Sequence, residues 1–468
     1  MTISQEHKDA LSAIVGSKGI VDTSDDLEPF LVEQRGMYRG NCDLVVRPAN
    51  TAETAKVVGV CHEHGISIVP HGGNTGLVGG GIPDGGIIID TSRMNAIRNI
   101  DPINQTITVE AGVILADIQQ AAADSGCLFP LSLGAEGSCR IGGNLSTNAG
   151  GVGVLRYGNT RDLTLGLEVV LPDGRIWDGL RSLRKDNTGY DLKQIFIGAE
   201  GTLGIITTAV MKLYPLPKQQ ETVVVTCSEP HDVLDMFSRA QSAFADSLTA
   251  FEMFPRIALE GVLEHVPGTT DPFDEISPYY AIIELSSPRE DEGLKDAFEG
   301  LLGTAFENGI ITNAVVASSQ TQAKDLWRLR ETIPEAERLD GPSFKHDVTV
   351  PVSSVADFLV RAKAEVEAEM DEVRVIAFGH MGDGNIHFNV CNPLNMAREE
   401  FLKEQDRFNK IVYDIVTDMG GSFSAEHGIG VLRRKEMTRY KSDVELDLMR
   451  DIKSTLDPNN IFNPGKVL

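Results

Sequence analysis

The stretch Pro70-His-Gly-Gly-Asn-Thr-Gly-Leu-Val-Gly-Gly-Gly81 follows an apolar run, residues 66–70, that is typical of a short buried strand. Six of the ten residues from 72 to 81 are glycine. Glycine lets backbone N–H groups approach a phosphate closely, and successive amides form a nest that binds anions. The stretch therefore predicts a phosphate cradle, with a purely structural Gly-rich turn as the alternative.

Two further Gly-rich segments follow in the same half of the chain. They read Ile141-Gly-Gly-Asn-Leu-Ser-Thr-Asn-Ala-Gly-Gly151 and Gly198-Ala-Glu-Gly-Thr-Leu-Gly-Ile-Ile206. The sequence contains neither the G-x-G-x-x-G of a Rossmann dinucleotide site nor the G-K-[ST] of a P-loop. The Gly-rich segments therefore predict one cradle assembled from separate loops at 72–77, 138–151 and 198–206.

Length, charge and cysteine content limit the number of domains, the kinds of partner and the cellular location that we expect. The chain has 468 residues, whereas one hydrophobic core usually stops growing near ~250–300 residues, so we expect more than one domain. The net charge of -26 opposes nucleic acid and anionic membranes as partners. The N-terminus shows no signal-peptide pattern, and no apolar run reaches the ~18 residues of a membrane span. The six cysteines form no C-x-x-C pair, which favours reduced thiols and a cytoplasmic location.

The pattern of predicted elements changes at Pro215-Leu-Pro217. Beyond this point strands alternate with long helices, one of which is predicted over residues 320–338. Such an alternation predicts an α+β layer with its helices packed on one face of a sheet.

A second chemical motif, Gly379-His-Met-Gly-Asp-Gly-Asn-Ile-His-Phe-Asn389, lies in this second half. Alternation along a strand places His387 and Asn389 on one face, and the Gly-Asp-Gly turn returns His380 toward them. Glu426, in Ser424-Ala-Glu-His-Gly428, could add a carboxylate. Two imidazoles and one carboxylate with open positions suit Zn²⁺ or another divalent transition ion. A hydrogen-bonded hairpin without metal is the alternative.

Together these motifs resemble the FAD-linked D-2-hydroxy-acid dehydrogenases, which have the vanillyl-alcohol-oxidase-type FAD-binding fold. The likeness runs from about residue 40 to the C-terminus, and Lys185-Asp-Asn-Thr-Gly-Tyr-Asp-Leu-Lys193 is most similar to the D-2-hydroxyglutarate branch. The resemblance implies an α+β chain with a two-part FAD-binding domain (1–218) and a ferredoxin-like substrate domain (219–420). A C-terminal helical segment (421–468) is expected to pack back on the FAD-binding domain.

The resemblance also implies the residues that bind FAD. Some relatives attach the flavin covalently through a histidine of the first loop, where this chain has Asn74, so we expect non-covalent FAD. The expected FAD-binding residues are Gly72, Gly73, Asn74, Thr75, Gly76, Leu77, Gly137, Ser138, Gly142, Gly143, Thr147, Gly151, Glu200, Gly201 and Ile206.

The remaining site residues are assigned in the same way. The positions matching His380, His387 and Glu426 hold a divalent metal in the family, here expected to be Zn with Mn or Fe as alternatives. The position matching His427 serves as the catalytic base. The expected substrate ligands are Asn389 at the head group and, at the tail, Arg330 and Lys345. Pro334 stands where the hydroxyglutarate branch has a threonine, and a proline cannot donate a hydrogen bond.

The expected activity is oxidation of a small anionic D-2-hydroxy acid by hydride transfer to flavin N5. The acid could be D-2-hydroxyglutarate, D-malate or D-lactate, and the electron acceptor an electron-transfer flavoprotein or quinone. A glycolate- or D-lactate-oxidising flavin subunit that reduces quinone is the main alternative. A metal hydrolase and a non-catalytic flavin subunit are the others, and a homodimer is one option for assembly.

Overall fold

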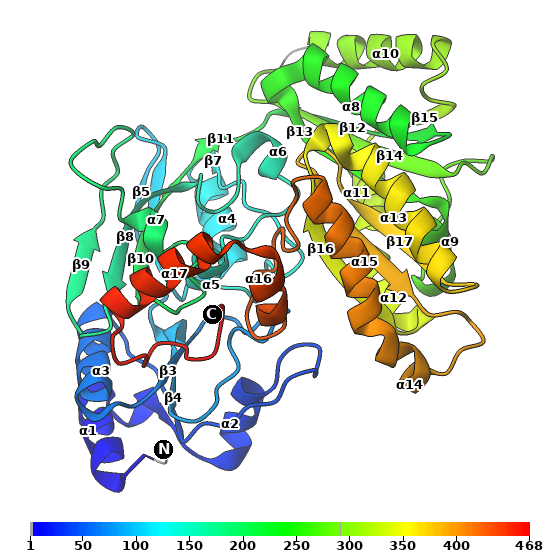
Figure 1. Cartoon of the computed structure of the whole chain (residues 1–468). Coiled ribbons are helices and arrows are strands. Elements are labelled where there is room, and N and C mark those ends of the chain that lie inside the picture. The colour runs from blue at the N-terminus through cyan, green and yellow to red at the C-terminus, as the bar shows by residue number, and fades with distance from the viewer. Residues whose placement is uncertain (1–2, 291) are drawn as a thin grey trace. The chain divides into compact units, whose positions relative to one another are not determined.

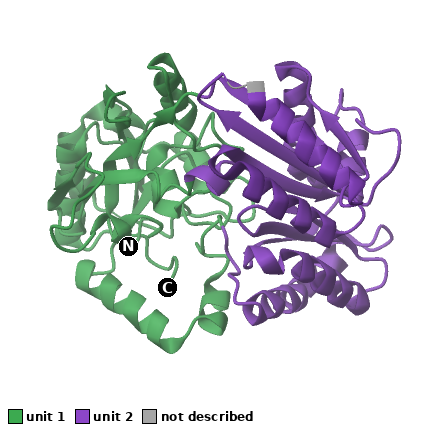
Figure 2. Cartoon of the chain, turned by 90° about the horizontal axis from the view of Figure 1, so that it is seen from above, with its two compact units in different colours: residues 1–151, 158–216, 426–468 green, residues 152–157, 217–425 purple. Residues whose placement is uncertain are grey.

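The computed structural model describes residues 3–290 and 292–468. The chain divides into two compact units, coloured separately in Figure 2. Unit 1 comprises residues 1–151, 158–216 and 426–468, and unit 2 comprises residues 152–157 and 217–425. The domain boundaries expected from the sequence, after residues 218 and 420, stay a prediction.

Unit 1 contains two main sheets. The first has the strand order β1-β2-β4-β3, in which β2, β4 and β3 are parallel; the strands are β1 (Ile20–Val21), β2 (Leu44–Val46), β3 (Ile68–His71) and β4 (Ile87–Asp90). The second is antiparallel in the order β5-β6-β10-β8-β9, with β5 (Ile97–Asp101), β6 (Thr106–Glu110), β8 (Thr164–Val170), β9 (Ile176–Gly179) and β10 (Ile205–Lys212). A short pair joins β7 (Cys127–Leu128) to β11 (Tyr214–Pro215).

Unit 1 also contains eight α-helices within its described residues (Figure 1). They are α1 (Gln5–Val15), α2 (Ser24–Leu31), α3 (Thr51–His64), α4 (Leu115–Asp124), α5 (Ile141–Thr147), α7 (Lys193–Phe196), α16 (Arg434–Tyr440) and α17 (Asp443–Leu456). The strands β2 and β4 are buried along their whole length because helices pack on the parallel sheet. The C-terminal residues Ile461 and Phe462 belong to the same core.

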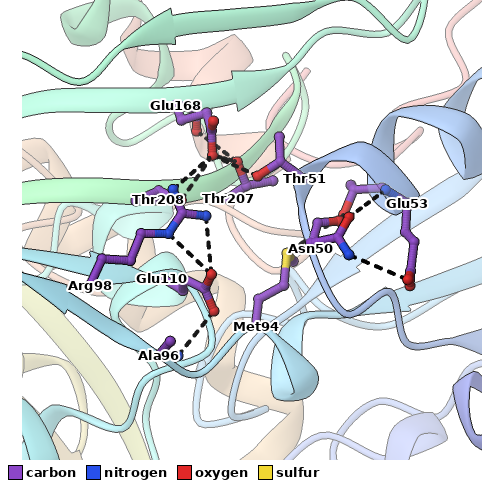
Figure 3. Close-up of polar contacts among 11 residues, drawn as sticks. Asn50, Thr51, Glu53, Met94, Ala96, Arg98, Glu110, Glu168, Thr207 and Thr208 are labelled. Atoms are coloured by element: carbon purple, nitrogen blue, oxygen red, sulfur yellow. Dashed lines mark hydrogen bonds and ion pairs between the residues drawn. The ribbon is translucent and has the colours of Figure 1, made fainter.

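A partly buried carboxylate, Glu168, joins α3 to the antiparallel sheet (Figure 3). Glu168 on β8 accepts hydrogen bonds from the hydroxyls of Thr51 (2.6 Å), Thr207 (2.9 Å) and Thr208 (2.9 Å). Arg98 lies 3.7 Å from the same oxygen. These hydrogen bonds compensate for the partial loss of water around the charge. They also hold α3 against the antiparallel sheet, whose strand β10 directly follows the third Gly-rich segment.

Unit 2 is built on one antiparallel sheet in the order β15-β12-β14-β13-β17-β18-β16. Its strands are β12 (Gln219–Cys227), β13 (Leu248–Pro255), β14 (Tyr279–Ser287), β15 (Asn313–Val316), β16 (Ser343–Thr349), β17 (Arg374–His380) and β18 (Asn385–Cys391). Its helices are α6 (Val154–Tyr157), α8 (Pro230–Phe244), α9 (Arg256–His265), α10 (Glu292–Glu307), α11 (Gln320–Glu331), α12 (Ile333–Asp340), α13 (Val355–Glu369), α14 (Arg398–Phe401) and α15 (Gln405–Asp418).

Helices cover both faces of this sheet, so the prediction that they pack on one face was wrong. On one face α9, α11 and α12 pack against Phe254, Ile282 and Ile376. On the other, Phe237 of α8 meets Phe251 of β13, and α13 and α15 pack beside each other (Figure 1). The reason is visible in β13, which is buried at nearly every position rather than alternately.

The helix predicted over residues 320–338 is in fact two helices, α11 and α12, which meet at Thr332. Pro334 is the second residue of α12, where its missing N–H costs no helical hydrogen bond. The restart turns α12 so that Ile333, Ala336 and Glu337 are buried. Pro334 therefore sets the start of the helix that carries Glu337.

The predicted state of the cysteines is confirmed. All six lie in the described part of the chain as free thiols, and only Cys42 is not fully buried. No helix within residues 3–290 or 292–468 has both the length and the apolar character of a membrane-spanning segment.

Candidate active site

The three Gly-rich segments predicted to form one cradle come together in unit 1. A Cβ added to Gly73 would lie 2.2 Å from the Ser138 carbonyl oxygen, so the first loop lies directly on the second. A Cβ on Gly201 would lie 3.0 Å from the Pro70 ring, which brings the third segment against the first. Glycine is therefore required at both contacts.

Each loop also contains a residue with left-handed backbone. Asn74 has φ 53°, Asn148 φ 51° and Glu200 φ 50°, between Gly198 (φ 79°) and Gly201 (φ 70°). Left-handed residues are uncommon outside glycine, and alternating right- and left-handed residues turn successive N–H groups to one side. This backbone suits an anionic group such as a pyrophosphate, so the residues present fit the expected FAD.

The other expected FAD-binding residues lie on the same segments. Gly142, Gly143 and Thr147 are on α5, Gly151 follows that helix, and Ile206 is on β10. Thr75, Gly76 and Leu77 are in the first loop, and Gly137 and Ser138 precede α5. The side chain of Asn74 donates to the carbonyls of Pro29 and Val32. An amide cannot form the covalent flavin bond of a histidine, which is consistent with dissociable FAD.

Arg140 fixes the first loop, a role that the sequence did not reveal. Its Nη1 donates to the Gly72 carbonyl (2.9 Å) and lies 2.5 Å from the Asp90 carboxylate at the end of β4. His71, which precedes the glycines, is buried beside Phe30, and burial lowers the pKa of His71. Its imidazole is therefore neutral near pH 7 and adds no charge to the loop.

Glu200 fastens the segment that follows His427. Its two carboxylate oxygens accept hydrogen bonds from the amides of Ile429 and Gly430, each at 2.8 Å. Burial raises the pKa of Glu200, and these amide bonds oppose that rise. The third Gly-rich segment and the loop after Glu426-His427 are thus joined within unit 1.

In unit 2, His380 at the end of β17 is oriented by a carboxylate that the sequence analysis missed. Its Nδ1 lies 2.6 Å from Glu252 Oε1, and Arg330 Nε donates to Glu252 Oε2 at 2.9 Å. Burial alone would raise the pKa of Glu252, but His380 and Arg330 lower it to about 2. An ionised Glu252 holds the proton of His380 on Nδ1, which leaves Nε2 unprotonated and suited to bind a metal.

His387 on β18 lies beside His380, with ring centroids 5.6 Å apart. Its Nδ1 is 3.8 Å from Asp347 Oδ1, and the Asn385 amide donates to the same Asp347 oxygen at 3.0 Å. Both histidines therefore have a neighbouring carboxylate, as metal-binding histidines usually do.

Unit 2 ends at Ala425, whose amide donates to the Asp347 carbonyl at 3.1 Å. Glu426 and His427 are the next two residues of the chain. The ligand atoms of His380, His387 and Glu426 lie within 4.8 Å of one another, and those of Asp347, His387 and His427 form a second such group. The two imidazoles and one carboxylate of the first group are a fitting donor set for a divalent transition metal.

The three expected substrate ligands all contact carboxylates of the protein itself. Arg330 is 7% exposed and pairs with Glu252, with Nη2 at 2.8 Å. Lys345 Nζ lies 2.6 Å from Glu337 Oε2, and the amide of Asn389 donates to both Glu337 oxygens. Neither Glu337 on α12 nor Glu252 on β13 was singled out from the sequence, because a buried glutamate has no local sequence signature.

Comparison with known proteins now identifies the family. A model described as "FAD linked oxidases, C-terminal domain" matches residues 216–467, and one described as "FAD binding domain" matches residues 42–179. The chain belongs to the FAD-linked oxidase family. It is an FAD-dependent oxidoreductase, as the sequence predicted, and the alternative of a metal hydrolase was wrong.

Curated relatives and solved structures agree with membership of the FAD-linked oxidases. "D-2-hydroxyglutarate dehydrogenase, mitochondrial" of Bos taurus is 38% identical, over 100% of this chain and 84% of its own length. "D-2-hydroxyglutarate--pyruvate transhydrogenase DLD3" of Saccharomyces cerevisiae is 35% identical, over 95% and 90%. A p-cresol methylhydroxylase structure superposes with a TM-score of 0.77 at 18% identity, covering 99% of this chain and 97% of its own. The predicted vanillyl-alcohol-oxidase-type fold is confirmed.

Proposed function

We propose that the chain is an FAD- and divalent-metal-dependent dehydrogenase that oxidises a D-2-hydroxy acid to the 2-oxo acid. The observation that carries the proposal is the grouping of His380, His387 and Glu426. The names of the curated relatives, several of which are D-2-hydroxyglutarate dehydrogenases, support the substrate class. Zn is the proposed metal, with Mn and Fe as alternatives.

The two cofactors supply what the side chains lack. When bound, FAD supplies a hydride acceptor for the α-carbon, and a divalent metal supplies the positive charge that acidifies the substrate hydroxyl. His380, His387 and Glu426 would hold the metal. The Gly-rich loops of unit 1 would hold the FAD.

The side chains have separate roles in this scheme. His427 takes the hydroxyl proton, because a neutral imidazole is a suitable general base at neutral pH. Glu252 positions His380, and Asp347 positions His387. Asn389 lies on the same strand face as His387 and is proposed to bound the substrate pocket.

The electron acceptor is proposed to be an electron-transfer flavoprotein or quinone. A glycolate- or D-lactate-oxidising subunit that reduces quinone is the second candidate. A non-catalytic flavin subunit would not need the His380, His387 and Glu426 donor set, which makes this alternative weaker.

Anaerobic reduction of the bound flavin by a D-2-hydroxy acid tests the proposed function. We expect the yellow protein to bleach and to form one equivalent of the matching 2-oxo acid for each reduced flavin. Protein that contains FAD and metal but is bleached by no D-2-hydroxy acid would contradict the proposal.

Glu252 offers a test of the proposed metal site. Glu252→Gln removes the charge that fixes His380, so we expect metal affinity to fall by about 10- to 100-fold, as is typical when such a partner is lost. The measurement is a competition titration with a coloured chelator. FAD content should not change, because the FAD loops belong to unit 1.

Glu260→Gln is the matched control for this variant, because Glu260 is an exposed carboxylate on α9 that pairs with Arg256. Its metal affinity should equal that of the wild type. Equal affinity in Glu252→Gln as well would rule out a positioning role for Glu252.

A further inference from the structure

We propose that Glu337 makes the enzyme selective for D-2-hydroxy acids with an uncharged side chain, by occupying with its own carboxylate the donors that a second substrate carboxylate would need. This inference rests on the proposed function and narrows its substrate class. It separates the chain from the D-2-hydroxyglutarate dehydrogenases that it resembles.

The position of these donors follows from the strand register. Asn389 is two residues from His387 on β18, so both side chains lie on one face about 7 Å apart along the strand. Lys345 on β16 is the direct partner of Asn389 in the antiparallel ladder. Asn389 and Lys345 therefore lie side by side on the sheet, two residues along from His387. The tail of a hydroxy acid bound at the proposed metal would extend toward them.

Glu337 extends from α12 toward Asn389 and Lys345, because α12 packs on the same face of the sheet. Its Oε1 and Oε2 lie 2.9 and 2.8 Å from Asn389 Nδ2, and Oε2 lies 2.6 Å from Lys345 Nζ. The Glu337 side chain is 2% exposed, so its charge has little access to water. The amide nitrogen of Asn389 carries two hydrogens, and it donates to both carboxylate oxygens of Glu337.

Arg330, the other residue expected to bind the substrate tail, is also paired with a carboxylate of the protein. Arg330 gives its Nε and Nη2 to Glu252, which in turn holds His380. Two cations, Arg330 and Lys345, thus face two buried carboxylates, Glu252 and Glu337, and their charges balance. Pro334, one turn before Glu337 on α12, adds no donor because it has no N–H.

A second carboxylate placed beside Asn389 and Lys345 would meet Glu337 at short range. Two carboxylates that share one buried site repel each other strongly, and displacing Glu337 would leave a buried charge without its partners. An alkyl tail of the same length neither repels Glu337 nor has to displace it. The geometry therefore favours tails that are apolar or neutral.

The test compares two acids with the same carbon chain, D-2-hydroxypentanoate and D-2-hydroxyglutarate, as reductants of the flavin under anaerobic conditions. We expect the wild type to prefer D-2-hydroxypentanoate by at least about 10-fold in the second-order rate constant, since like-charge contacts cost at least this much. Glu337→Gln keeps the shape and removes the charge. We expect it to shift the ratio toward D-2-hydroxyglutarate by about 10-fold or more.

Two further variants make the result specific. Glu337→Leu frees Lys345 and Asn389 entirely and should shift the ratio in the same direction, which covers the case that Glu337→Gln folds poorly. Glu335→Gln changes an exposed glutamate of the same helix and should leave the ratio unchanged.

The outcomes are distinguishable. A wild type that prefers D-2-hydroxyglutarate, or a ratio unchanged in both Glu337 variants, overturns the role of Glu337 while the proposed function stands. Absence of flavin reduction by either acid, in wild type and variants that contain FAD and metal, overturns the proposed function and this inference together.

Discussion

We expect His427→Ala to lower the rate of flavin reduction by a D-2-hydroxy acid by roughly 10²–10⁴-fold, the usual cost of removing a general base. The variant keeps the donor set of His380, His387 and Glu426, so its metal content should stay the same. Its FAD content should also stay the same, because no expected FAD-binding residue is changed. Rapid mixing under anaerobic conditions measures the rate.

The pH dependence adds a readout that a purely structural role would not produce. In the wild type the rate should rise with pH as His427 loses its proton, and in His427→Ala this rise should disappear. His231→Ala, which changes a half-exposed histidine paired with Asp357, is the control. A near-normal rate in His427→Ala would assign the base to another residue.

Removal of the metal is expected to abolish turnover while the protein stays yellow. The expected FAD-binding residues all belong to unit 1, whereas His380 and His387 belong to unit 2, so loss of metal should not release FAD. Without the metal the substrate hydroxyl keeps the high pKa of an alcohol, and His427 is too weak a base to deprotonate it.

The experiment is dialysis against a chelator, followed by metal analysis, the flavin spectrum and an activity assay. Adding back Zn²⁺, Mn²⁺ or Fe²⁺ separately should restore turnover and identify the metal. His387→Ala should reproduce the metal-free protein and should not be rescued by added metal. Full activity in a sample shown to be free of metal would contradict a catalytic metal.

The fold and the cofactor class could be predicted because their signals are local. Gly73 and Gly204 must pass close to other backbone, and each stands in a short Gly-rich run that is visible in consecutive residues. The pair His380 and His387 was readable for the same reason, since one turn and one strand place them together.

Features that depend on distant residues could not be predicted. Glu252 lies 78 residues from Arg330 and 128 from His380, so no window of sequence contains the group that positions His380. Glu337 is similar, because it lies 52 residues from Asn389 in the chain. The helices on both faces of the unit 2 sheet were missed because fully buried strands such as β13 lack the alternation that marks one covered face.

The central claim is tested most directly by adding a D-2-hydroxy acid and, separately, its L-enantiomer to the anaerobic, metal-loaded flavoprotein. The flavin colour reports the reaction in one turnover and needs no knowledge of the electron acceptor. We predict that D-2-hydroxypentanoate bleaches the flavin and that L-2-hydroxypentanoate does not. Equal bleaching by the two enantiomers, or no bleaching by any D-2-hydroxy acid, would contradict the account.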